Sequence, residues 1–392
     1  MRINKFFTVL FLLQMNLFAQ STFAQNKTIK HVEWKIASQL PNINPHEKQL
    51  GLAGLMGGMH NNVLLMVGGS NFPNAMPWEG GKKKYWNNIY ALNKNGENYN
   101  CVLLKDTLKQ PIAYGASVNT PSGIICMGGE NENGIQKDVF LMQWNIATKH
   151  VDIKTLPPLP IAVTNTSATI IGSIVYVAGG EQKDEASSAF FAMDLNVQNL
   201  SWQMLPSLPI ALSHAAVVAQ SNGKETCIYV IGGRTKTASG VSELHGTVFC
   251  YQPSIKTWKS CKSLQSENGS TNLSAATAVA INSNEIVVMG GDDGKIFTQL
   301  ETLNAKISQT LNLEESNQFK KEKLGLINHH QGFNTSVRIY NTIADSWELL
   351  NKLPYSPVTT FATINNNLIF IPCGEIKPGI RTANILVGEI KR

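Results

Sequence analysis

Short runs of alternating apolar and polar residues recur along the chain, and turn signals separate them. Residues 174–178, 189–193 and 201–205, for example, read as three successive strands with a period of two. Many of the apolar runs end in a Gly-Gly doublet. The doublets recur at roughly 50-residue spacing, which predicts a repeat architecture; they are Gly68-Gly69, Gly128-Gly129, Gly179-Gly180, Gly232-Gly233, Gly290-Gly291 and the degenerate Cys373-Gly374.

A second marker runs in step with the doublets. It is an apolar residue followed six positions later by Leu and usually then by Pro. Both markers occur six times, so the sequence predicts six repeats. The second marker stands at Trp34/Leu40, Val102/Leu108, Ile153/Leu159, Trp202/Leu208, Trp258/Leu264 and Trp347/Leu353.

Each repeat has room for four short strands, which together with the doublet and the later Trp is typical of a kelch-type β-propeller. Glycine leaves space where neighbouring blades approach closely, and the large aromatic ring fills the gap between them. The sequence therefore predicts an all-β fold, a six-bladed kelch-type β-propeller.

The order of the markers indicates how the ring closes. A Trp marker precedes the first doublet, and the last repeat ends without one. We therefore expect the N-terminal strand to be the fourth strand of the last blade, which hides a sheet edge. A single domain at 25–392 is expected, with blades at about 51–108, 112–159, 162–208, 211–264, 272–353, and 358–392 plus 32–40.

The fifth blade carries an insertion between Gly291 and Trp347. Phe297, Leu300 and Ile307 keep helical spacing among polar residues. The pattern predicts one or two amphipathic helices, which could cap the channel mouth or form a dimer surface.

The N-terminus has the pattern of a signal peptide at residues 1–24. Arg2 and Lys5 precede an apolar stretch, and small residues precede a cut after Ala24. Removal of the two cations lowers the formal net charge from +6 to +4. No polybasic run or later apolar span remains, so we expect a periplasmic protein that binds no nucleic acid and does not insert into the membrane.

Several kinds of site have no pattern in the chain. Metal-binding His spacing, a nucleophile elbow and a phosphate-binding loop are all missing. His214 and His245 are interpreted as structural. Of the six cysteines, Cys250 and Cys261 flank a turn almost symmetrically and could face each other as a disulfide.

The C-terminal segment carries the most distinctive chemistry. Glu375 and Arg381 lie six residues apart, on either side of a Pro378-Gly379 turn. Arginine can hold a carboxylate bidentately while glutamate takes a proton from a hydroxyl, so the pair suits a sugar acid. A loop ion pair without further function is the alternative.

Five other residues occupy the position directly after a doublet and are expected at equivalent sites around the axis: Ser70, Glu130, Glu181, Arg234 and Asp292. Together with Glu375 they predict a polar channel mouth, although each could instead cap loop amides. The loop at 71–85 carries Trp78, a flat face on which a sugar could stack.

The segment Gly374 to Thr382 (Gly-Glu-x-Lys-Pro-Gly-x-Arg-Thr) resembles the signature of the N-acetylneuraminate epimerase (sialic acid mutarotase) family of periplasmic six-bladed kelch propellers. The similarity extends over the whole mature chain and includes Tyr114-Gly115 and the loop at 71–85. The block at 51–92 resembles the family's C-terminal portion but comes first, which indicates a cyclically permuted branch. Arginines that the family often carries are missing around Ile112 and Ser213.

The resemblance implies an exported isomerase that interconverts the α and β anomers of N-acetylneuraminate by ring opening and reclosure, without metal or cofactor. Glu375 is the expected proton acceptor. The expected substrate-binding residues are Arg381, Lys377, Tyr114, Asn71 and Glu130.

The proton donor to the ring oxygen stays open between Lys377, Tyr114 and a water molecule. A non-catalytic propeller that binds a glycan or a protein partner is the alternative function. A copper radical oxidase on the same fold would need His and Tyr ligands grouped about the axis, and the sequence shows no such group.

Overall fold

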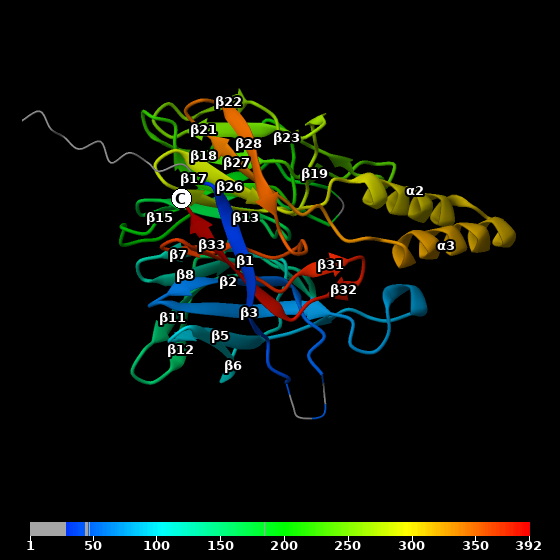
Figure 1. Cartoon of the computed structure of the whole chain (residues 1–392), viewed down its shortest axis with the longest axis horizontal. Coiled ribbons are helices and arrows are strands. Elements are labelled where there is room, and N and C mark those ends of the chain that lie inside the picture. Colours follow the sequence, from blue (N-terminus) through cyan, green and yellow to red (C-terminus); the bar gives the residue numbers. More distant parts are fainter. Residues whose placement is uncertain (1–28, 44–45, 47, 184) are drawn as a thin grey trace, which may run out of the picture.

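The inner strands of neighbouring sheets contact one another around a common axis, which gives the chain a propeller architecture (Figure 1). The computed structural model describes residues 29–43, 46, 48–183 and 185–392. Within these residues the strands form six blades of antiparallel sheet, and the two α-helices belong to the insertion. The all-β six-bladed prediction is confirmed. The signal peptide predicted at 1–24 lies outside the described residues.

Each blade has four main strands, which follow one another from the axis outward. They are β2 (Ala53–His60), β3 (Val63–Asn71), β5 (Asn88–Asn95) and β6 (Asn98–Thr107); β7 (Ala116–Thr120), β8 (Gly123–Met127), β11 (Val139–Asn145) and β12 (His150–Leu156); β13 (Ser167–Ile171), β14 (Ile174–Ala178), β15 (Phe190–Asp194) and β16 (Gln203–Met204); β17 (Ala216–Ser221), β18 (Thr226–Ile231), β21 (Val248–Gln252) and β22 (Thr257–Cys261); β25 (Thr277–Ile281), β26 (Glu285–Met289), β27 (Ser336–Asn341) and β28 (Ser346–Lys352); and β29 (Thr363–Asn365), β30 (Leu368–Pro372), β33 (Asn384–Lys391) and β1 (His31–Gln39).

Shorter elements lie in the connections between these strands. They are β4 (Lys84–Tyr85), which pairs with β3, the 3-10 helix η1 (Pro77–Glu79), and the two-stranded hairpins β9 (Glu130–Asn131) with β10 (Gly134–Ile135), β19 (Arg234–Thr235) with β20 (Glu243–Leu244), β23 (Gln265–Ser266) with β24 (Gly269–Ser270), and β31 (Glu375–Lys377) with β32 (Ile380–Arg381).

The N-terminal strand closes the ring as predicted. β1 pairs antiparallel with β33 and places Trp34 opposite Gly388. A Cβ on Gly388 would lie 2.6 Å from the Trp34 ring, so glycine lets the indole lie on the strand. The pairing covers the edge of β33, a strand edge that would otherwise be free to pair with another chain.

The Gly-Gly doublets lie where one blade meets the next. The amide of Gly180 donates to the Leu212 carbonyl of the following blade at 2.8 Å, and Gly129 does the same to Val163. A Cβ on Gly179 would come 2.2 Å from the Leu212 oxygen. Side chains are therefore excluded by close backbone contact between blades.

The repeated Trp residues also link blades. The Trp202 indole nitrogen donates to the Pro157 carbonyl at 2.9 Å, and Trp258 donates in the same way to Pro206. Each donor joins the outer part of one blade to the blade before it. The predicted role of the aromatic marker between blades is confirmed.

The insertion in the fifth blade forms two helices, α2 (Lys295–Gln309) and α3 (Leu313–Asn328). Asn312 caps α3, because its side chain accepts hydrogen bonds from the Glu314 and Glu315 amides. Leu303 and Ile327 are buried. The helices project from the end of the propeller that also carries β19, β31 and β32 (Figure 1).

The six cysteines are free thiols in the part of the chain that the structure describes. The register of β21 with β22 pairs Cys250 with Lys259 and Cys261 with Val248. The two thiols are therefore diagonal neighbours and not opposite each other, and the disulfide considered for this pair is not formed. No helix among the described residues has the length and apolar character of a membrane span.

A comparison of two glycines in the third blade tests the close contact between blades. Gly179 and Gly172 have φ angles of 63° and 59°, but only Gly179 faces a neighbouring backbone oxygen. Gly172→Ala should cost about 1–2 kcal/mol, because it strains only its own backbone. Gly179→Ala should cost about 1–3 kcal/mol more, because the new methyl overlaps Leu212.

Denaturant unfolding of both variants measures the difference. Equal losses of unfolding free energy in the two variants would contradict the argument.

Candidate functional site

The residues that follow the doublets occupy equivalent positions around the axis. Five of them form an isolated β-bridge with a residue just ahead of the inner strand of their own blade, as Glu375 does with Val358, and Ser70 pairs with Ala53 at the start of β2. The residue directly after each bridge partner adopts a left-handed backbone conformation, as Tyr114 does after Ala113 (φ 61°) and His214 does after Ser213 (φ 56°). A cavity of about 160 Å³ on the axis is lined by these left-handed residues. The residues that follow the doublets are therefore tied by backbone pairing to segments that line this cavity.

Glu375 and Arg381 are brought together by the hairpin β31–β32, which pairs the two residues directly. Gly379 makes the turn with a φ of 78°. An Arg381 Nη2 to Glu375 Oε2 distance of 2.9 Å forms an ion pair, and the Gly379 amide donates to Glu375 Oε1 at 3.2 Å. The predicted proximity of acid and base is confirmed.

The Glu375 carboxyl is partly open to the mouth, with 21% of its side chain exposed. Burial raises the pKa of Glu375 above its usual range, although the Arg381 cation and the Gly379 amide oppose the shift. The charges of Lys83 and Arg234 act in the same opposing direction, so both cations lie within electrostatic reach. A carboxylate with a raised pKa is a stronger base toward a hydroxyl than an ordinary one.

The Arg381 guanidinium is buried and makes most of its contacts with other groups of the protein. Its side chain is 5% exposed, and besides Glu375 it contacts the Gly379 carbonyl oxygen and the Phe72 ring, whose centroid lies 4.5 Å from Cζ. Its Nε atom is buried and has no hydrogen-bond partner among the described residues. Arg381 is therefore held as the close partner of Glu375, with little of its fork free for a ligand.

A second polar cluster surrounds Lys83 from the loop at 71–85. Lys83 Nζ lies 3.1 Å from Glu130 Oε1 and 4.7 Å from the centre of the Tyr114 ring. The Tyr85 hydroxyl also donates to Glu130, at 2.7 Å, and the Ser70 hydroxyl donates to that of Tyr114 at 2.9 Å. Burial lowers the pKa of Lys83, but Tyr114 and Glu130 outweigh burial and the net shift is upward. Tyr114 and Glu130 thus meet at one side of the mouth.

Asn71 and Lys377 lie differently from the other predicted site residues. Asn71 is 3% exposed; its amide donates to the Gly51 carbonyl, and its oxygen accepts from the Trp86 indole. These bonds use both polar ends of Asn71 to anchor the loop. Lys377 is partly buried on β31. Burial lowers the pKa of His330, the buried histidine after α3, and the Lys377 charge adds to this shift.

Trp78 packs on the turn of the β31–β32 hairpin. A Cβ on Gly379 would come 2.9 Å from the Trp78 ring. The sugar-stacking role predicted for Trp78 is not tested by this contact. The ring supports the turn that holds Glu375 and Arg381.

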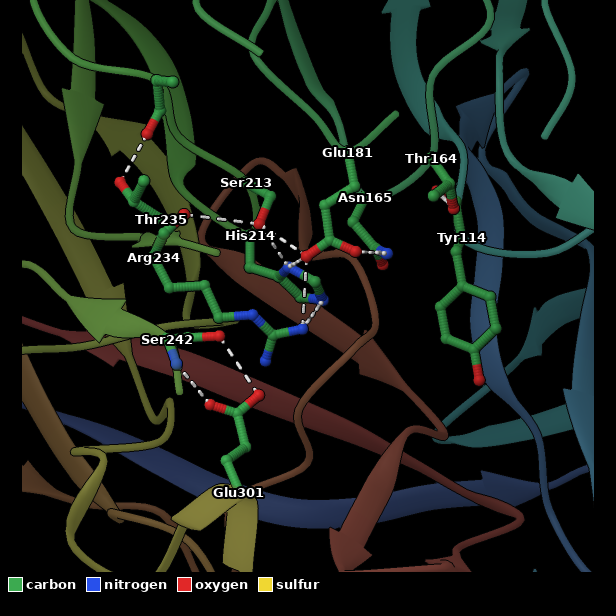
Figure 2. Close-up of polar contacts among 11 residues, drawn as sticks. Tyr114, Thr164, Asn165, Glu181, Ser213, His214, Arg234, Thr235, Ser242 and Glu301 are labelled. Atoms are coloured by element: carbon green, nitrogen blue, oxygen red, sulfur yellow. Dashed lines mark hydrogen bonds and ion pairs between the residues drawn. The ribbon is translucent and has the colours of Figure 1, made fainter. Parts of the chain in front are cut away.

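A third cluster joins the third and fourth blades, and Figure 2 shows its side chains converging. Glu181 Oε1 accepts from the Ser213 hydroxyl at 2.8 Å and lies 3.4 Å from Arg234 Nη2. Arg234 Nη2 also lies 3.3 Å from His214 Nε2. Burial, reinforced by the Arg234 charge, lowers the pKa of His214 to about 3, so the ring is neutral at pH 7.

Asp292 completes the acidic side of the mouth. Burial raises the pKa of its carboxyl, although the Gly294 amide donates to it at 2.8 Å and Arg234 opposes the shift. In the described chain no three His, Cys, Asp or Glu residues are grouped to hold a metal ion.

A model of the N-acetylneuraminate epimerase family matches residues 13–151 and 156–392. The chain belongs to this family.

Curated relatives from several genera carry the family's name. The chain is 27% identical over 248 residues to the N-acetylneuraminate epimerase of Haemophilus influenzae (strain PittEE), 28% over 235 residues to that of Vibrio vulnificus (strain YJ016), and 25% over 239 residues to that of Brucella melitensis biotype 1. The alignments cover 62%, 58% and 60% of this chain and 61%, 58% and 59% of the relatives. The match therefore spans about three fifths of the relatives' length.

The solved structure of YjhT shares the fold. It aligns with a TM-score of 0.58 and 15% identity, over 89% of this chain and 97% of that one. The family and fold predicted from the Gly374–Thr382 signature are thus confirmed. The cyclic permutation and the roles of the site residues in this epimerase-family chain stay predictions.

Some site residues were not singled out by the sequence. Lys83 stands in a Lys run that reads as a solvated surface, and Phe72 carries no signal. The sequence marks Arg234 only by its place after a doublet and favours a structural role for His214. Each becomes part of the mouth through contacts between different blades or loops.

An NMR titration of Glu375 tests the electrostatics of this epimerase-family site. The carboxyl should titrate above its ordinary range. In Arg381→Gln the pKa should rise by about 1 unit or more, because the cation that favours the ionised form is gone.

Arg392→Gln, which alters an exposed C-terminal cation, should leave the Glu375 titration unchanged. A fall of the pKa in Arg381→Gln would show that Arg381 does not stabilise the ionised carboxylate.

Proposed function

We propose that this chain is an exported mutarotase that interconverts the α and β anomers of N-acetylneuraminate. One observation carries the proposal. A carboxylate with a raised pKa, Glu375, opens onto the propeller mouth beside Arg381, within the segment that bears the family's signature. Family membership supports the sugar acid as substrate.

Glu375 would begin the reaction by taking the proton of the anomeric hydroxyl. The electron pair left on that oxygen forms the ketone as the bond from the anomeric carbon to the ring oxygen breaks. The ring oxygen gains a proton from a general acid and becomes a hydroxyl. That hydroxyl then attacks the other face of the carbonyl and returns its proton to the same acid as the ring recloses. Glu375 returns its proton to the new anomeric oxygen, so no proton is gained or lost overall.

Arg381 would keep Glu375 ionised and oriented. Arg381 holds Glu375 Oε2 in the ion pair, and the Gly379 amide holds Oε1. The exposed part of the carboxylate would then face the substrate. A substrate carboxylate bound to Arg381, as the sequence predicts, would have to compete with Glu375 and the Gly379 carbonyl for the same guanidinium. Of the candidate acids, Tyr114 lies beside Lys83 at the mouth, whereas the charge of Lys377 acts on His330.

An NMR time course of freshly released α-N-acetylneuraminate tests the activity. The protein should speed anomer exchange, and Glu375→Gln should reduce the enzymatic rate by about 10²–10⁴-fold because general-base catalysis is lost. Binding measured by calorimetry should be largely kept. Glu348→Gln, an exposed carboxylate on β28, should behave as wild type.

Unaccelerated exchange by wild-type protein, with binding retained, would identify a non-catalytic sugar-binding propeller instead.

Export is the second part of the proposal. Expressed in a host with two membranes, the mature chain should begin at Gln25, because small residues precede that bond. N-terminal sequencing of the periplasmic fraction checks this. Ala24→Lys should block the cut, and an unprocessed wild-type chain in the cytoplasm would refute export.

A further inference from the structure

Three cationic side chains lie at the mouth: Arg381, Lys83 and Arg234. They differ in how many of their hydrogen-bond donors already contact protein groups. Arg381 is buried against Glu375, Gly379 and Phe72. Lys83 is paired with Glu130 and lies over the Tyr114 ring. Arg234 is 21% exposed, and within the described structure only its Nη2 atom contacts protein acceptors. The remaining edge of its guanidinium is free.

The hydrogen bonds around His214 orient that guanidinium. An arginine can only donate, so His214 Nε2 must be the acceptor of the Arg234 contact at 3.3 Å. The ring proton is therefore on Nδ1, which faces the Ser213 hydroxyl at 3.1 Å and Glu181 Oε1 at 3.5 Å. Glu181 thus holds Arg234 both directly and through a fixed His214 tautomer (Figure 2).

The helical insertion covers one face of Arg234. The Phe297 ring of α2 lies 4.7 Å from the Arg234 Cζ atom. Glu301, one turn further along α2, accepts from the amide and hydroxyl of Ser242 at 2.6 and 3.1 Å (Figure 2). Helix α2 is therefore anchored to the loop that follows Arg234. A guanidinium stacked on one face and free along one edge suits bidentate binding of a carboxylate.

Arg234 and Glu375 belong to the same ring of residues that follow the doublets. Arg234 contacts His214, and Glu375 is bridged to Val358, which precedes Thr359; His214 and Thr359 both line the axial cavity. The Arg234 charge opposes the pKa rise of both Glu375 and Asp292, which belong to the sixth and fifth blades. In N-acetylneuraminate the carboxylate and the anomeric hydroxyl are carried by the same carbon. One sugar can therefore bridge a guanidinium and a carboxylate that lie within about 8 Å of each other, with a normal hydrogen bond at each end.

We infer that Arg234, held by Glu181, His214 and Phe297, binds the carboxylate of the substrate while its anomeric hydroxyl faces Glu375. The inference rests on the proposed function for the choice of sugar. Binding of the substrate carboxylate is thereby assigned to Arg234 of the fourth blade, supported by Phe297 of the insertion, and not to Arg381. Phe297 acts as a positioning residue, because it reaches the substrate only through Arg234.

Kinetics with the free acid and its methyl ester test the assignment. For the acid, Arg234→Gln should raise KM by about 10- to 100-fold, the loss expected for charge-assisted hydrogen bonds, with kcat changed far less. The uncharged methyl ester should show little difference between wild type and variant. Arg234→Lys should lie between them, because it keeps the charge without the fork.

Two further variants complete the design. Phe297→Leu should raise KM for the acid a few-fold and leave the ester unaffected, which loss of fold alone would not do. Arg392→Gln is the matched control for removal of a surface guanidinium and should equal wild type. Thermal unfolding of each variant verifies that it is folded, and Arg234→Lys carries the test if Arg234→Gln does not fold.

The outcomes separate this inference from the proposed function. An unchanged acid-to-ester ratio in Arg234→Gln and Arg234→Lys, or an acid-selective loss in Arg381→Gln instead, would overturn the inference even if wild type catalyses exchange. Loss of acid binding in Arg234→Gln by calorimetry, with no exchange by wild type, would support Arg234 as the anchor and refute the mutarotase.

Discussion

A chain of backbone hydrogen bonds around the axis is the constraint on which the site depends. At the start of each inner strand one residue adopts a left-handed conformation, and five amides donate to the carbonyl of the preceding blade: Gly54 to Thr359, Tyr114 to Gly54, Asn165 to Tyr114, His214 to Asn165 and Ala275 to His214. The doublet amides add a parallel set of contacts. Since these bonds join backbone to backbone, they fix the spacing of the blades whatever the side chains are.

The same geometry creates room for chemistry. One residue at the start of each inner strand is left-handed, and the residue after each doublet is pinned beside it by backbone pairing. Except for the buried Ser70, the residues at these positions are partly exposed, and they differ from blade to blade. Glu375, Arg234, Glu181 and Asp292 thus occupy equivalent positions around one axis, although they come from four different blades. A rigid ring with variable mouth residues is a common way to place function on a repeat fold.

The insertion and the loop at 71–85 turn this symmetric ring into an asymmetric site. Phe297 covers Arg234 on one side, and Phe72 covers Arg381 on another. Both aromatic rings lie against guanidinium groups that would otherwise be open to solvent. Glu375, the ion-pair partner of Arg381, is itself buried enough that its pKa is raised.

Local signals determined the blades, the closing strand, the insertion helices and the contact of Glu375 with Arg381. Each of these follows from spacing, glycine or a short turn, because the interacting residues are close in sequence or repeat in register. Tertiary structure alone decided which cations are free. Arg381 is enclosed by Phe72, and Arg234 is held by His214. Each of these contacts joins residues that are distant in sequence. The periodicity of one segment does not specify which side chain of another segment will pack against it.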